Sequence, residues 1–227
     1  MSAGIETTVH LVETTVHGRY LLRLPAGRPA GLLVGFHGYG EDAAAHLAAL
    51  VEVPGAGEWA LAAVQALHPF YRGSTGEVVA SWMTRLDREL AIADNVRYVG
   101  AAVADARRRA GVDRPLVYLG FSQGVAMAYR AAAGAGHACD AVCVLAGDLP
   151  PELAERDLPG FPPVLLGAGK EDTRFNPSVL EGDAALLESK GITVTTCLFD
   201  GGHEWTDDYR CAVAGLLRGL RANAADE

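Results

Sequence analysis

Hydrophobic positions along the chain follow two alternating patterns. Eight stretches are apolar at successive or alternate positions, and the continuous ones are typical of strands covered on both faces. These stretches are Val9–Glu13, Val16–Leu24, Leu32–His37, Leu61–Leu67, Pro115–Gly120, Ala141–Ala146, Val164–Gly169 and Ile192–Asp200. Between them, helical spacing recurs over Asp42–Val51, Arg85–Ala110, Gln123–Gly134, Pro177–Lys190 and Asp207–Arg221. Strands that alternate with helices predict an α/β fold, with a mainly parallel central sheet and helices on both faces.

The start of this pattern and its proline-rich stretch complete the predicted architecture. The first two strands are joined without a helix, so we expect an antiparallel N-terminal hairpin at one edge of the sheet. The segment Asp148–Pro163 carries five prolines in sixteen residues and predicts a loop, too short to fold as a cap domain. Since no linker divides the chain, we expect a single domain over residues 1–227.

Composition and charge exclude several classes of protein. Half of the residues are apolar and 21% are charged, which is typical of a globular domain. A formal net charge of −9, without a compensating basic cluster, disfavours a nucleic-acid partner. No apolar run approaches the ~18 residues of a membrane span, and the N-terminal residues lack the features of a secretory signal. We therefore expect a cytoplasmic protein.

The four cysteines favour structural thiols over metal ligands. None of them forms a CxxC pair or lies beside histidines at zinc-finger spacing. They are Cys139, Cys143, Cys197 and Cys211. We expect free thiols and no metal site, with a disulfide left open by the sequence.

The sharpest chemical signal is the segment Gly120-Phe121-Ser122-Gln123-Gly124, which matches G-x-S-x-G. A strand-like run comes directly before it and an Ala-rich helical pattern follows at once, so the chain has to turn sharply at the serine. The two glycines remove side chains that would clash in such a turn, and the helix N-terminus directs backbone N–H groups at a developing oxyanion. This context predicts that Ser122 is a nucleophile.

A serine hydroxyl needs a base to become nucleophilic, and the base needs an acid to orient it. In folds with such a strand–serine–helix turn, the triad residues occur along the chain in the order Ser, acid, His, and the last two follow later strands. His203 follows the strand Ile192–Asp200 in a glycine-flanked loop, and Asp172 follows the strand Val164–Gly169. We therefore predict a triad of Ser122, Asp172 and His203.

Other histidines and acids are weaker candidates. His10, His17 and His46 are expected at the surface, His37 and His68 precede the serine, and His137 lies in a Gly/Ala loop. Asp148 also follows a strand and is the alternative acid, whereas Glu171, adjacent to Asp172, is expected to point elsewhere.

A third element, His37-Gly38-Tyr39-Gly40-Glu41-Asp42, comes directly after the apolar strand residues Leu32–Phe36. A glycine-flanked turn lets a backbone N–H approach the active serine, so the amides of Tyr39 and Gln123 are expected to form an oxyanion hole.

With these motifs in place, the sequence resembles the phospholipase/carboxylesterase family of α/β-hydrolases, which includes small bacterial carboxylesterases and acyl-protein thioesterases. The resemblance runs from HGYGED through GFSQG to GKEDTRFNP and GGHEW, and GFSQG is its most specific part. It implies the α/β-hydrolase fold, the triad and the two oxyanion amides. It also implies hydrolysis of esters or thioesters without a metal or organic cofactor.

The residues that would shape the substrate pocket depart from the family pattern. Tyr39 stands where an aliphatic residue is usual after HG, and Phe175-Asn176 replaces a common aliphatic–proline pair. The stretch Ser81-Trp82-Met83 resembles a family segment that walls the pocket. Candidate pocket residues are Tyr71, Trp82, Phe175 and Trp205, with a buried core role as the alternative for Trp82.

The sequence thus predicts a serine carboxylic-ester hydrolase acting on a small-molecule ester, with thioesters or lysophospholipids as alternative substrates. The rival functions are cleavage of a lactone, peptide or C–C bond on the same fold, and a non-catalytic binding module. Acyl-chain length and oligomeric state, including a homodimer, stay open.

Overall fold

The computed structural model describes residues 7–225, and most of its elements follow the predicted alternation of strands and helices. The strands are β1 (Tyr20–Arg23), β2 (Leu32–Phe36), β3 (Ala60–Val64), β4 (His68–Tyr71), β5 (Val78–Ser81), β6 (Leu116–Phe121), β7 (Ala141–Leu145), β8 (Val164–Gly169) and β9 (Val194–Phe199). The helices are α1 (Ala43–Val51), α2 (Arg88–Ala110), α3 (Gln123–Gly134), α4 (Pro151–Ala154), α5 (Ser178–Ser189) and α6 (Asp207–Ala225), with a 3₁₀ turn at Ala56–Glu58.

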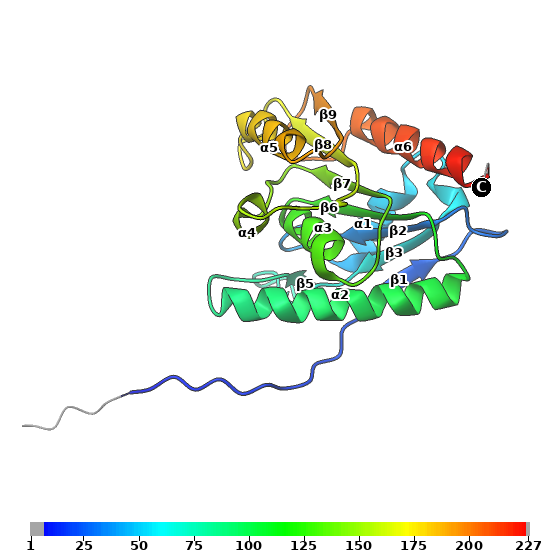
Figure 1. Ribbon diagram of the computed structural model, residues 1–227. Helices are drawn as coiled ribbons and strands as arrows, with labels where there is room; N and C mark the ends of the chain where they lie inside the picture. The colour runs from blue at the N-terminus through cyan, green and yellow to red at the C-terminus, as the bar shows by residue number, and fades with distance from the viewer. Residues whose placement is uncertain (1–6, 226–227) are drawn as a thin grey trace, which may run out of the picture.

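A seven-stranded sheet of order β1-β3-β2-β6-β7-β8-β9 forms the centre of the molecule (Figure 1). All neighbouring strands pair in parallel except β1, which runs antiparallel to β3. The predicted mainly parallel sheet is confirmed. Strands β4 and β5 pair with each other in a separate antiparallel sheet.

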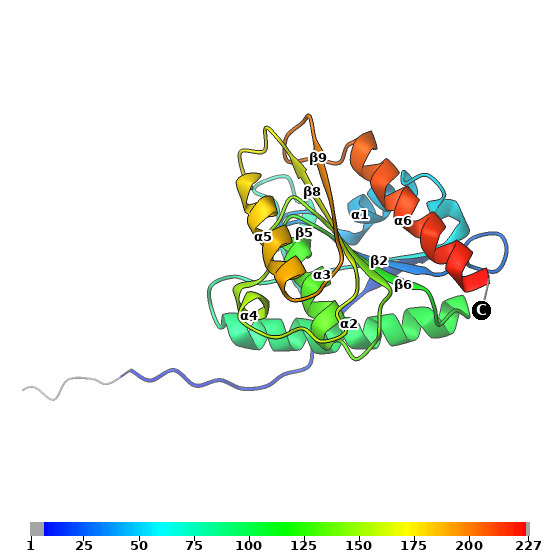
Figure 2. The same cartoon turned by 45° about the horizontal axis from the view of Figure 1, so that its top comes forward.

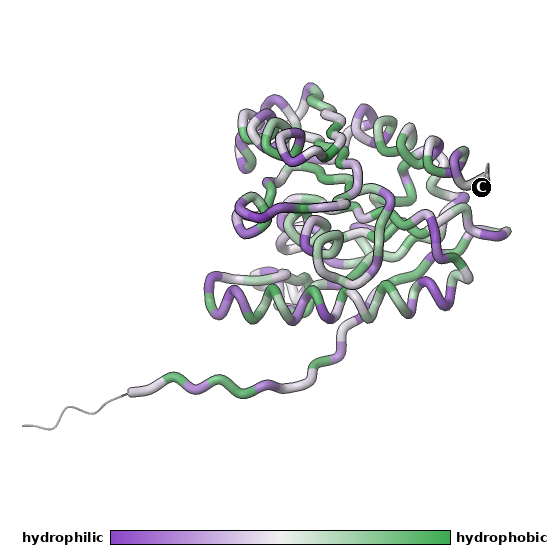
Figure 3. The backbone as a smooth tube through the Cα atoms, viewed as in Figure 1, coloured by the Kyte–Doolittle hydropathy of each residue, from purple (hydrophilic) through white to green (hydrophobic). Residues whose placement is uncertain are grey.

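Helices cover both faces of this sheet, as predicted. Figure 2 shows α2, α3 and α5 on one face and α1 and α6 on the other. Successive strand residues point to opposite faces, so Leu32 and Val34 of β2 join one apolar core and Leu33 joins the other. Figure 3 shows this pattern as mostly apolar central strands. Burial on both faces is why these strands read as continuous apolar runs.

The predicted antiparallel pairing at one edge of the sheet is confirmed, but its partners differ. Strand β1, which lies within the predicted Val16–Leu24, pairs with β3. The strand predicted over Val9–Glu13 is wrong, because residues 7–19 form no strand and are exposed. Their alternation has no apolar surface to cover among the described residues, and a two-stranded ribbon alone is marginal in water.

Two further predictions changed in detail. The proline-rich segment Asp148–Pro163, predicted as a loop, contains the one-turn helix α4, which begins at Pro151, a position that tolerates the missing N–H. The hairpin of β4 and β5 was not predicted, since each strand has only four residues and β4 is largely exposed. All four cysteines are free thiols, as expected, and Cys143 is buried on β7.

A charged cluster ties three helices together beside the sheet. The Arg130 guanidinium of α3 is buried, and its Nε donates to Glu152 Oε1 of α4 at 2.7 Å. Arg88 Nη2 of α2 donates to the second oxygen of Glu152 at 3.0 Å. Burial acts to raise the pKa of the Glu152 carboxyl, but the hydrogen bonds from both arginines outweigh it and hold the pKa at about 2. The folded state therefore favours ionised Glu152.

We expect Glu152→Gln to lower the free energy of unfolding at pH 7 by about 1–2 kcal/mol, because Arg130 loses its charged partner and Glu152 is only partly buried. The folded pKa lies below the ordinary value of 4.5, so this stabilisation is present at neutral pH and is lost as the pH falls towards 2. Urea unfolding at pH 7 and pH 3 measures both effects. Glu155→Gln, at an exposed neighbour, is the control. An equal difference from wild type at both pH values would contradict the linkage.

Candidate active site

Ser122 stands at the sharp turn between β6 and α3, as the motif predicts. Its backbone has φ 53° and ψ −119°, a left-handed conformation that is costly for a residue with a side chain. The Ser122 amide donates to Leu145 O of β7 at 2.9 Å, which fixes the turn against the sheet. The hydroxyl is therefore presented at the carboxyl end of the parallel strands.

The glycines on either side of Ser122 make this turn possible. A Cβ added to Gly120 would lie 2.3 Å from Gly124 O, and one added to Gly124 would lie 2.0 Å from Phe36 O of β2. Both neighbours are backbone atoms and have little freedom to move. The close approach at Gly124 also places the turn after β2 directly beside the serine.

Three predicted residues meet in one hydrogen-bonded line. His203 Nε2 lies 2.9 Å from Ser122 Oγ, and His203 Nδ1 lies 2.7 Å from Asp172 Oδ2. An ionised carboxylate only accepts, so Nδ1 carries the ring proton and Nε2 accepts from the serine hydroxyl. The other oxygen of Asp172 accepts from the amides of Arg174 and Phe175 at 2.8 and 2.9 Å. The arrangement can pass a proton from Ser122 to His203 while Asp172 holds the ring.

The loops that carry Asp172 and His203 support each other beyond the ends of β8 and β9. The amides of Lys170 and Glu171 each donate at 2.9 Å, to Phe199 O and Gly201 O. The ring of Phe121 lies 5.1 Å from the His203 ring, centroid to centroid. These contacts set the position of the His203 imidazole beyond the ends of the strands, and its orientation.

The turn after β2 contributes backbone amides. Within residues 7–225, the amides of Tyr39 and Gln123 donate to no protein acceptor. His37 is buried under the turn, where its Nδ1 donates to Gly38 O at 2.7 Å and its Nε2 accepts from the Ala66 amide at 3.0 Å. Burial lowers the pKa of His37, so the ring stays neutral and serves as a fixed support.

The side chain of Gln123 is directed into the protein rather than at a substrate. Its Oε1 accepts from the Trp82 amide at 2.9 Å, and its Nε2 donates to Met83 O at 3.0 Å. The Trp82 indole is fully buried, and its Nε1 donates to His37 O at 2.9 Å. Trp82 therefore has the core role that was the alternative to a pocket wall.

The other three pocket candidates differ widely in exposure. Tyr71 on β4 is 69% exposed, whereas Phe175 is buried in the apolar core. Trp205 is partly buried and its ring contacts those of Phe121, His46 and Tyr209. Of these three, only Trp205 has a ring contact with the elbow, through Phe121.

Of the remaining histidines and acids, one expectation was wrong. His46 was expected at the surface but is buried, because it lies on the inner face of α1, where Gly35 leaves room for its ring. Burial lowers the pKa of His46 to about 3. Asp148 and Glu171 are exposed, and Asp172 is the acid bonded to His203.

Glu41 is the charged residue near the serine to which the sequence assigned no role. Its carboxylate Oε2 accepts from the Gly38 amide at 2.8 Å. Burial raises the pKa of the Glu41 carboxyl, while the hydrogen bond from Gly38 opposes that shift. In the sequence, the feature that could have pointed to Glu41 was the acidic pair Glu41-Asp42 at the end of HGYGED.

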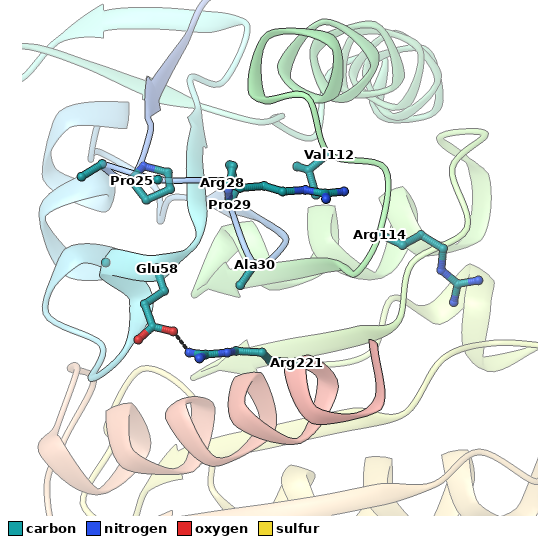
Figure 4. A pocket seen from close by; sticks show the side chains of 11 residues that line it. Pro25, Arg28, Pro29, Ala30, Glu58, Val112, Arg114 and Arg221 are labelled. Carbon is teal, nitrogen blue, oxygen red and sulfur yellow. Dashed lines mark ion pairs between the residues drawn. The ribbon is translucent and has the colours of Figure 1, made fainter. Parts of the chain in front are cut away.

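A surface concavity of about 650 Å³ is lined by none of the residues of this site, and Figure 4 shows the side chains that line it. It is lined at the amino ends of β2, β3 and β6 by residues that include Arg28 and an ion pair between Arg221 and Glu58. Ligand sites of open parallel sheets lie at the opposite, carboxyl ends of the strands, where Ser122 is found. Within residues 7–225, no cluster of His, Cys, Asp or Glu could hold a metal ion, and no helix could cross a membrane.

Comparison with known proteins relates this fold to that of esterases. No protein-family model and no curated protein matches the sequence. The solved structure of esterase PE8 is similar, with a TM-score of 0.74, 24% identity, and coverage of 90% of this chain and 100% of that one. A Bacillus cereus carboxylesterase has a TM-score of 0.67 and 16% identity, and the match covers 89% of this chain and 94% of that one. A Zea mays acyl-protein thioesterase 2 has a TM-score of 0.67 and 19% identity, and the match covers 90% of this chain and 100% of that one. The chain has the α/β-hydrolase fold, as predicted.

We expect Gly124→Ala to destabilise the protein by about 1–3 kcal/mol or more, because its Cβ would overlap the Phe36 carbonyl. Gly134→Ala, in the last position of the same helix, is the matched control, since its Cβ would lie 3.4 Å from Val96 Cγ1, an ordinary contact. We expect the control to change stability by less than about 1 kcal/mol. Urea unfolding measures the free energy of unfolding of the two variants. Equal values would contradict the close backbone contact at Gly124.

Proposed function

We propose that this chain is a serine hydrolase of carboxylic esters, of the phospholipase/carboxylesterase family, with Ser122, His203 and Asp172 as its catalytic triad. The observation that supports this most strongly is the unbroken hydrogen-bonded line from Asp172 through His203 to a serine in a left-handed turn. A strained serine with a base and an oriented acid is the arrangement that acyl transfer needs.

The first half of the reaction forms an acyl-enzyme. Ser122 Oγ attacks the ester carbonyl carbon as His203 Nε2 takes the hydroxyl proton. The carbonyl oxygen becomes an oxyanion and accepts from the amides of Tyr39 and Gln123. As the C–O bond to the alcohol breaks, His203 returns its proton to the leaving oxygen.

The second half repeats the sequence with water. His203 takes a proton from a water molecule, whose oxygen attacks the acyl carbon, and a second oxyanion occupies the same two amides. Collapse of this intermediate releases the acid, and Ser122 recovers its proton from His203. Throughout, Asp172 keeps the imidazole in the Nδ1–H tautomer and stabilises the imidazolium that forms.

The proposed substrate class is a small-molecule ester, with thioesters and lysophospholipids as alternatives. Its support comes from the structural relatives, which are a carboxylesterase, an esterase and an acyl-protein thioesterase. The triad and the oxyanion amides use no metal or organic cofactor in the steps above.

We expect Ser122→Ala to abolish covalent labelling by a fluorophosphonate probe and hydrolysis of p-nitrophenyl butyrate, because the probe and the ester both need Oγ. Gel fluorescence and absorbance at the nitrophenolate band measure the two losses. Ser178→Ala, at an exposed serine, is the control and keeps both. Labelling that persists in folded Ser122→Ala would overturn the assignment of the nucleophile.

We expect Asp172→Asn to lower kcat by about 10⁴-fold, since the amide cannot hold His203 in the same tautomer or balance the imidazolium charge. The matched control is Asp148→Asn, which changes the alternative acid and leaves kcat within about threefold of wild type. Steady-state kinetics on p-nitrophenyl butyrate compare the two. A larger loss in Asp148→Asn than in Asp172→Asn would reverse the choice of acid.

A further inference from the structure

Glu41 places a second carboxylate close to the nucleophile. A Cβ built on Gly38 would lie 3.3 Å from Glu41 Oε2 and equally 3.3 Å from Ser122 Cβ. The Glu41 carboxylate and Ser122 therefore both lie close to the same glycine. None of the proton transfers of the proposed reaction uses this carboxylate, so its presence needs another explanation.

The hydrogen bonds of the turn explain it. Of the four successive amides from residue 38 to residue 41, three donate within the protein. Gly38 donates to the Glu41 carboxylate, Gly40 to Ala80 O at 3.0 Å, and Glu41 to Gly38 O at 3.3 Å. In the described part of the chain, the amide of Tyr39 is the one left without an acceptor. The turn thus leaves one donor for the oxyanion.

Glu41 closes this turn from both sides. Its backbone N–H bonds Gly38 O, its side chain bonds the Gly38 N–H, and its carbonyl accepts from the Ala80 amide of β5 at 2.8 Å. Without the side-chain acceptor, the Gly38 N–H is unsatisfied in a partly buried place. The peptide units around Gly38 are then held less firmly, because glycine tolerates many backbone conformations.

We propose that Glu41 is a positioning residue, whose carboxylate binds the Gly38 amide so that the Tyr39 amide faces the oxyanion formed at Ser122. This inference rests on the proposed ester hydrolysis. It assigns to Glu41 the role of a hydrogen-bond acceptor rather than of a charge. A negative charge near the oxyanion is unfavourable, and the guanidinium of Arg72, which follows β4 in the chain and donates to Gly40 O of this turn, offsets it.

Two substitutions separate the acceptor from the charge. Glu41→Ala removes the acceptor, and we expect kcat for p-nitrophenyl butyrate to fall by about 10- to 100-fold, part of the loss seen when an oxyanion donor is deleted. We expect KM to stay within about threefold. Glu41→Gln keeps an oxygen for the Gly38 amide without the charge, and we expect it to retain kcat within about threefold.

Inhibition by a trifluoromethyl ketone reports on the oxyanion hole directly, because this compound binds as a tetrahedral oxyanion on the serine. We expect its Ki to rise in Glu41→Ala in proportion to the loss of kcat, and to stay unchanged in Glu41→Gln. Should Glu41→Ala fail to fold, Glu41→Leu, which keeps the bulk and removes the acceptor, carries the same expectation.

Asp42→Ala is the matched control on the same turn. Asp42 Oδ1 caps α1 through the Ala45 amide at 2.7 Å, so this change lowers the melting temperature but leaves kcat and Ki unchanged. Unchanged kcat in folded Glu41→Ala, or a loss in Glu41→Gln as large as that in Glu41→Ala, would overturn the positioning role. Wild-type protein that neither hydrolyses the ester nor reacts with the fluorophosphonate would instead refute the proposed function.

Discussion

The contact between the end of β2 and the start of α3 is the constraint on which the site depends. These two backbones touch because Gly124 has no side chain, and a Cβ there would lie 2.0 Å from Phe36 O. Parallel pairing sets Phe36 opposite Gly120, so the turn after β2 and the turn after β6 leave the sheet at the same height. This contact brings together the two turns that carry the amides proposed for the oxyanion hole.

A similar close contact between two backbones occurs at a glycine beside the proposed acid and base. A Cβ on Gly169 would lie 2.3 Å from both Gly201 O and Gly202 O, so the loops after β8 and β9 also approach backbone to backbone. Backbone contacts of this kind leave little freedom for the groups that follow them. Asp172 and His203 are thereby held within hydrogen-bonding distance, which is the preorganisation that the proposed reaction requires.

The sequence predicted those parts of the molecule that depend on local pattern. The central strands were visible because burial on both faces makes them continuously apolar, and Ser122 was visible because its turn needs glycine at 120 and 124. The strand at Val9–Glu13 was predicted wrongly, because alternation alone does not supply a surface to bury. The burial of His46 depends on tertiary packing, to which neighbouring residues in the sequence give no guide. The contact of Glu41 with Gly38 is local, but it depends on the backbone conformation of the turn, which the residue types alone do not specify.

In the proposed site, the backbone and the side chains have separate roles. Tyr39 and Gln123 are proposed to act through their amides, while the Tyr39 ring stacks on Phe70 at 5.4 Å and the Gln123 side chain binds Trp82 and Met83. Since an amide is common to all residues except proline, position 39 can change without loss of the donor. What the proposed chemistry requires is the close approach of the glycines and the closure of the turn, rather than a particular side chain at position 39.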